Sequence, residues 1–73
     1  MRVRKRSVYV FRPVMMDVVW SQHHSAVEGQ RVRVIQMHGA PPPNIMGQCH
    51  IEDAATCQFV GMVCTRSLVK EEV

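Results

Sequence analysis

The sequence predicts an all-β protein, a small five-stranded antiparallel barrel, and three observations support this fold class. Apolar residues make up 47% of the 73 residues but aromatic residues only 5%, so valine and methionine must supply most of the core. Valine favours strands, because branching at Cβ suits a pleated surface. Turn signals divide the chain into segments of about 5 residues, the ordinary length of a strand. The chain closes on an apolar segment, a tight turn and a second apolar segment over residues 59–69.

The first expected strand lies near the N-terminus. Residues 7–11 (SVYVF) form it, and it ends before Pro13 because proline lacks the backbone donor that a ladder needs. Residues 14–21 (VMMDVVWS) fit either a second strand or an irregular turn that folds over one end of the core. Residues 22–26 have no clear period, so we expect a loop there.

The next strand has the clearest pattern in the chain. Residues 31–37 (RVRVIQM) place Val32 and Val34 on one face and Arg31 and Arg33 on the other. This alternation is typical of a strand with one buried face and one solvated face.

The second half of the chain supplies the remaining strands. Three prolines in residues 38–44 exclude a helix or a central strand and favour a stiff exposed loop. In residues 47–52 we expect Cys49 and Ile51 to face inward. The segments after it, in order, are a hairpin connection at 53–58, a strand at 59–64, a tight turn at 65–67 and a closing strand at 68–69. No segment predicts a helix.

Length bounds the organisation to a single domain over residues 1–73. Within it we expect a basic arm at 1–6, the barrel at 7–69 and a short tail at 70–73. A chain this short buries little surface, so its stability is expected to be marginal, and self-association can cover what the barrel leaves exposed. The chain has no apolar run of membrane-spanning length and no secretory signal pattern, which leads us to expect a cytoplasmic protein.

Two segments resemble SH3-type barrels. Residues 61–68 (GMVCTRSL) are similar to the closing part of that family, in which a glycine-led strand ends at a single 3₁₀ turn and a short last strand pairs back to the first. Residues 28–35 (EGQRVRVI) resemble the strand that follows the family's long first loop. The resemblance covers residues 8–69 and implies an SH3-like fold.

The residues that give SH3-type and related proteins their activities are absent here. Peptide-binding SH3 domains carry a tryptophan after the middle loop, an acidic long loop, and a proline and a tyrosine in the closing turn. This chain has GQCHI at 47–51, one acid (Asp17) in the long loop before Glu28, and Cys64 and Ser67 in the closing turn. The residues 28–34 are also similar to a strand of type II dihydrofolate reductase, a tetramer around a central pore, but its Val-Gln-Ile-Tyr pore motif is missing. Neither activity is therefore expected.

Cysteine and histidine spacing argues against a metal site and against catalysis. Cys49, Cys57 and Cys64 form no C-x-x-C pair, and their odd number disfavours a disulfide scaffold, so we expect reduced thiols. Cys64 with His38 or His50 and Asp53 supplies the residue types of a nucleophilic site, but nothing in the sequence brings them together. We expect no enzyme activity, no cofactor and no metal.

Function is expected to be that of a non-enzymatic binding module that self-associates into a homo-oligomer. The stiff loop offers a protein-binding segment, whose residues are His38, Pro41, Pro42, Pro43 and Asn44. An alternative is nucleic-acid binding through phosphate contacts, since the formal net charge is +3 and basic residues are clustered. The residues in question are Arg2, Arg4, Lys5, Arg6, Arg31 and Arg33. A third possibility is a small-molecule site at the centre of a symmetric oligomer.

Overall fold

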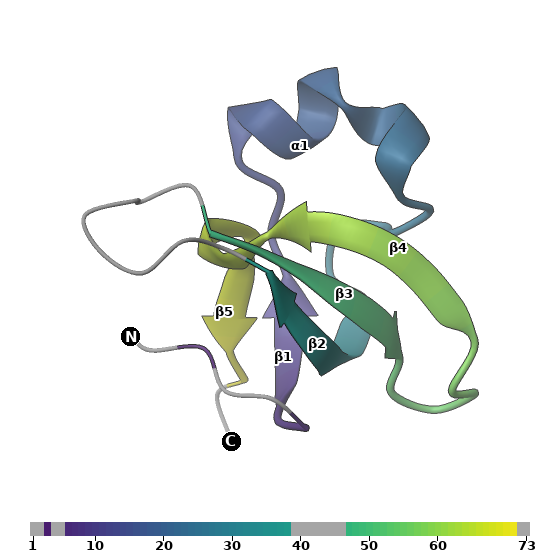
Figure 1. Cartoon of the computed structure of the whole chain (residues 1–73). Helices are drawn as coiled ribbons and strands as arrows, with labels where there is room; N and C mark the ends of the chain where they lie inside the picture. Colours follow the sequence, from purple (N-terminus) through teal and green to yellow (C-terminus); the bar gives the residue numbers. More distant parts are fainter. Residues whose placement is uncertain (1–2, 4–5, 39–46, 72–73) are drawn as a thin grey trace.

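Five antiparallel strands form one sheet in the order β4-β3-β2-β1-β5 (Figure 1). The computed structural model describes residues 3, 6–38 and 47–71. The strands are β1 (Val8–Phe11), β2 (Arg31–His38), β3 (Gln48–Asp53), β4 (Phe59–Cys64) and β5 (Leu68–Lys70). Each strand lies where the sequence places it, to within a single residue at either end, and the all-β class is confirmed. Lys70, which the expected boundary assigns to the tail, is the last residue of β5.

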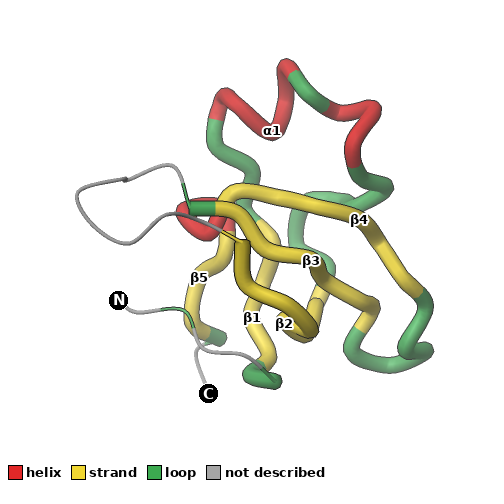
Figure 2. The backbone as a smooth tube through the Cα atoms, viewed as in Figure 1, coloured by secondary structure: helices red, strands yellow, loops and turns green. Residues whose placement is uncertain are grey.

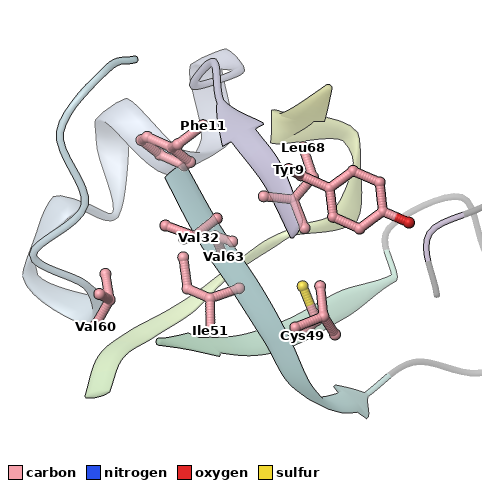
Figure 3. Close-up of a cluster of buried hydrophobic side chains, with 9 residues drawn as sticks. Tyr9, Phe11, Val32, Cys49, Ile51, Val60, Val63 and Leu68 are labelled. Atoms are coloured by element: carbon pink, nitrogen blue, oxygen red, sulfur yellow. The ribbon is translucent and has the colours of Figure 1, made fainter. Parts of the chain in front are cut away.

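One face of the curved sheet supplies the hydrophobic core (Figure 3). Val32, Val34, Cys49 and Ile51 are fully buried, so the inward faces expected for β2 and β3 are confirmed. The rest of the cluster comes from β1, β4 and β5 and comprises Tyr9, Phe11, Val60, Val63 and Leu68. Valine therefore fills much of the core as expected, but the expectation for methionine is wrong among the described residues, because no methionine among them belongs to the cluster and Met15 is exposed.

The closing turn is also confirmed. A 3₁₀ turn, η2 (Thr65–Ser67), carries the chain directly from β4 to β5, the two ends of the strand order. β5 then pairs with β1, with Leu68 opposite Phe11. Both side chains are buried, so this pairing fixes the last strand against the core.

Residues 14–21 differ from both expectations, because they are neither a strand nor an irregular turn. They contain a short helix, α1 (Met15–Val19), and a 3₁₀ turn, η1 (Ser21–His23), extends into the expected loop. Both contact β4 (Figure 2). α1 has no side-chain N-cap, and valine is a poor helix former, so contacts with the rest of the fold must stabilise this helix.

Gly61 allows β4 to lie directly against the segment that follows η1. Its φ is +132°, and a Cβ atom there would lie 2.5 Å from the carbonyl oxygen of His23 and 2.7 Å from Cα of His24. His24 forms an isolated bridge with Gly61, and the Ser25 amide donates to the carbonyl of Val60 at 2.9 Å. Part of the free edge of β4 is thus paired by this loop, which reduces the risk of edge-to-edge aggregation.

Candidate functional site

Helix α1 has an inverted pattern of burial. Its single charged residue, Asp17, is 4% exposed, whereas three of its four large apolar residues, Met15, Val18 and Val19, are exposed. The exposed fractions are 75% for Met15, 56% for Val18, 60% for Val19 and 44% for Trp20 at the helix end. These four residues are called the helix surface below. A surface helix of an ordinary globular protein buries its apolar side and exposes its charges, so this arrangement requires an explanation.

Hydrogen bonds to the corner between β4 and β5 explain why Asp17 is inside. Both carboxylate oxygens accept from the Cys64 amide, at 3.1 Å each. The hydroxyl of Ser67, a residue with no exposure, donates to Oδ2 of Asp17 and accepts from the Val14 amide at 3.0 Å. Among the described residues Asp17 forms no ion pair, so neutral donors alone compensate its burial.

His24 anchors the other end of the helical segment. Its Nδ1 accepts from the Ala26 amide at 3.0 Å, so in the neutral ring Nε2 carries the proton. Nε2 lies 3.0 Å from the carbonyl oxygen of Asp17 and donates to it. The ring also packs edge-to-face on Phe11, with a centroid distance of 5.3 Å. Asp17 and His24 together fix α1, so the helix surface is held in a defined orientation.

A second feature is a basic hollow of about 580 Å³ on the sheet face opposite the core. One of its lining residues is Val10 on β1, which pairs with Arg31 on β2 and with Val69 on β5. The lining residues are Val10, Arg12, Gly29, Arg31, Val69, Lys70 and Glu71. Arg31 is therefore part of a concave site, together with Arg12 and Lys70. These two basic residues are not among the nucleic-acid-binding residues predicted from the sequence.

Arg31 and Arg33 lie on the outer face of β2 as expected, but their surroundings differ. Arg33 donates to Oε2 of Glu52 at 2.8 Å and to the carbonyl of Ala54 at 3.3 Å, and its Nη1 lies 3.7 Å from Sγ of Cys57. These contacts engage Arg33 over the β3–β4 turn, away from the basic hollow. The structure thus separates the two arginines that the sequence groups together.

The other candidate residues are only partly described. Arg6 is exposed, and its amide donates to the carbonyl of Val34. His38 is the last residue of β2. The remaining ones lie outside the described residues, namely Arg2, Arg4, Lys5, Pro41, Pro42, Pro43 and Asn44. The expectations that rest on them therefore stay predictions.

All three cysteines are free thiols. Burial raises the pKa of Cys49 to about 12 and that of Cys64 to about 11, and the nearby Asp17 carboxylate adds to both shifts. Cys57 is exposed in the β3–β4 turn, where its φ is +62°. A thiol must lose its proton to act as a nucleophile or a metal ligand, and burial opposes that loss. We therefore interpret the two buried cysteines as core residues.

No group of three or more His, Cys, Asp or Glu side chains in the described segments is arranged to hold a metal ion. None of the helices described has the length and apolar character that crossing a membrane requires. Comparisons of the chain with protein-family models, with curated proteins and with solved structures find no match.

Proposed function

We propose that this chain is an SH3-like barrel that acts as a non-enzymatic interaction module in the cytoplasm and self-associates through its helix surface. The observation that supports the proposal is the inverted burial of α1. Four large apolar side chains face solvent on a helix whose charged residue is fixed inside by Cys64 and Ser67. Exposed apolar side chains that gather on one short segment are typical of a contact surface.

A second copy of the chain is the partner that this surface fits. The exposed fractions correspond to roughly 400 Å² of surface per chain, so a symmetric pair would bury about 800 Å² in all, in the range of weak and transient contacts. The chain has a formal net charge of +3, which opposes association through most of its surface. The helix surface itself carries no charge, because Asp17 is buried, and can therefore face its own copy without repulsion.

The SH3-like assignment has its own support. The strand order β4-β3-β2-β1-β5, the long segment between β1 and β2, and the 3₁₀ turn between β4 and β5 all agree with the resemblance of residues 8–69.

Sedimentation velocity over a range of protein concentrations tests the proposal. The expected result is a monomer–dimer equilibrium that Val19→Gln weakens by at least about tenfold, since the change occurs on both sides of a two-fold interface. Val27→Gln is the matched control, because Val27 is 67% exposed but lies outside the helix. A chain that stays monomeric throughout, or equal effects of the two substitutions, would refute self-association through α1.

A further inference from the structure

Arg31 presents its guanidinium to the basic hollow in a geometry that suits an anion. Its Nε lies 2.9 Å from Oε1 of Glu71, and its Nη2 donates to Oε2 of the same carboxylate at 3.2 Å. One face of the guanidinium thus engages both carboxylate oxygens, one through a hydrogen bond and the other as a close ion-pair contact, and arginine approaches carboxylate and phosphate groups in this way. Glu71 thus marks the position in which Arg31 can bind the oxygens of an anionic group.

The contact between Arg31 and Glu71 can be exchanged for another. Their side chains are 59% and 38% exposed, and exposed ion pairs are weak because water and salt compete with them. Arg33, by comparison, is 30% exposed, is bound to Glu52 and Ala54, and does not line the hollow. Of the two arginines on the outer face of β2, Arg31 is therefore the one that a ligand can reach.

Charge around the hollow favours a negative ligand. Among the described residues, three basic ones line it, Arg12, Arg31 and Lys70, and the only carboxylate in that lining is that of Glu71. Arg12 has a further acidic neighbour, Glu28, but at 3.6 Å and with both side chains more than half exposed. An anionic ligand would thus meet the guanidinium of Arg12 in addition to that of Arg31, which Glu71 now binds.

The rest of the lining indicates what the anion is attached to. Val10 and Val69 are cross-strand neighbours that line the hollow between the basic residues. Valine side chains offer contact area but no hydrogen bonds, so they suit an aliphatic or planar group. The hollow is open to solvent and its lining extends from β2 across β1 to β5, so a ligand larger than a lone inorganic ion can lie in it.

We propose that the basic hollow binds a phosphate ester, with the phosphate on Arg31 and Arg12 and an apolar or planar part against Val10 and Val69. Glu71 acts as an internal competitor that the phosphate displaces from Arg31. The ester can be a free nucleotide or the backbone of a single-stranded oligonucleotide, which share this chemistry. The site is independent of the helix surface and does not rest on self-association.

Isothermal titration at fixed ionic strength tests the site with three probes, which are inorganic phosphate, adenosine monophosphate and a short oligothymidylate. Arg31→Gln should weaken binding at least about tenfold, and Glu71→Gln should strengthen it about three- to tenfold, because the competitor is removed. Glu52→Gln is the matched control, since it makes the same change of net charge but frees Arg33. A urea unfolding curve for each variant verifies that it is folded.

The outcomes separate the two sources of the ester. Binding of the nucleotide at one per chain, with the expected effects at Arg31 and Glu71, identifies a free nucleotide as a sufficient ligand. Binding of the oligonucleotide alone, with the same effects and an affinity that falls with salt, identifies the backbone. The proposal is overturned if no probe binds, if inorganic phosphate binds as tightly as the esters, or if Glu52→Gln strengthens binding as much as Glu71→Gln.

Discussion

The two buried thiols make stability sensitive to alkaline pH. The pKa of Cys49 is raised from 9.0 to about 12 in the folded state, chiefly by burial, and that of Cys64 to about 11. The unfolded chain therefore ionises these thiols first. The contribution of the protonated thiols to the free energy of unfolding is fully present below pH 9. It falls as the pH rises from 9.0 towards the folded-state pKa of about 12, because in that interval only the unfolded chain loses the protons.

Urea unfolding midpoints between neutral pH and pH 11 measure this effect. We expect Cys49→Ala to flatten the fall above pH 9, since one of the shifted groups is gone. Cys57→Ala removes an exposed thiol instead and should leave the slope of the parent protein unchanged. Equal slopes for Cys49→Ala and the parent protein would show that the buried thiol is not the source.

At the scale of the single residue, sequence patterns predict burial well where neighbours along the strand decide it. Val32, Val34, Cys49 and Ile51 are buried because alternation in a strand places them on one face. The same reasoning cannot find Asp17, since its donors at Cys64 and Ser67 lie 47 and 50 positions away. The sequence does contain one signal, an isolated acid inside the apolar run VMMDVVW. Burial of its carboxylate is one of few ways to explain an acid at such a position.

Helix α1 is attached to the corner between β4 and β5 by the side chain of Asp17. Replacing Asp17 by Asn removes the charged acceptor of the Cys64 amide and the Ser67 hydroxyl, and it leaves donors in a buried site without a full set of acceptors. We expect Asp17→Asn to lower the free energy of unfolding by about 2–3 kcal/mol. Urea denaturation measures the loss, and faster hydrogen exchange at the Cys64 amide locates it.

Glu28→Gln provides the control for this substitution. Glu28 is also acidic and lies in the same connection between β1 and β2, but its side chain is 67% exposed and its only ion pair in the described segments, to Arg12, is long. Its replacement should change the free energy of unfolding by less than about 0.5 kcal/mol. If Asp17→Asn cost no more than this, the buried hydrogen bonds would not be what stabilises α1.

The elements differ in how far local sequence determines them. β2 to β5 and the turn η2 follow from alternation and turn residues, and they lie where these patterns place them. α1 does not, because five residues with two valines and no cap have little intrinsic helix preference. Contacts with β4, and the close passage that Gly61 permits, decide its conformation, and these exist only once the sheet has formed.

For the whole molecule, a last strand that pairs back to the first could be predicted, but the sites on its surface could not. The basic hollow combines residues that are distant in sequence. Arg12 comes from the segment after β1, Arg31 from β2 and Lys70 from the end of β5. The clustering of basic residues in the sequence predicts anion binding. It groups Arg31 with Arg33, however, whereas in the fold Arg31 lies with Arg12 and Lys70. Concavity is a property of the assembled sheet and has no local sequence signal.

The helix surface and the basic hollow should act independently, because no side chain of the helix surface is among the residues that line the hollow. Val19→Gln changes no charge and should leave the affinity for adenosine monophosphate within about twofold. Glu71→Gln should likewise leave the monomer–dimer equilibrium within about twofold. Nucleotide titration of the first variant and sedimentation of the second measure both effects. A larger change in either variant would mean that self-association changes access to the hollow, and that the helix surface and the hollow do not act independently.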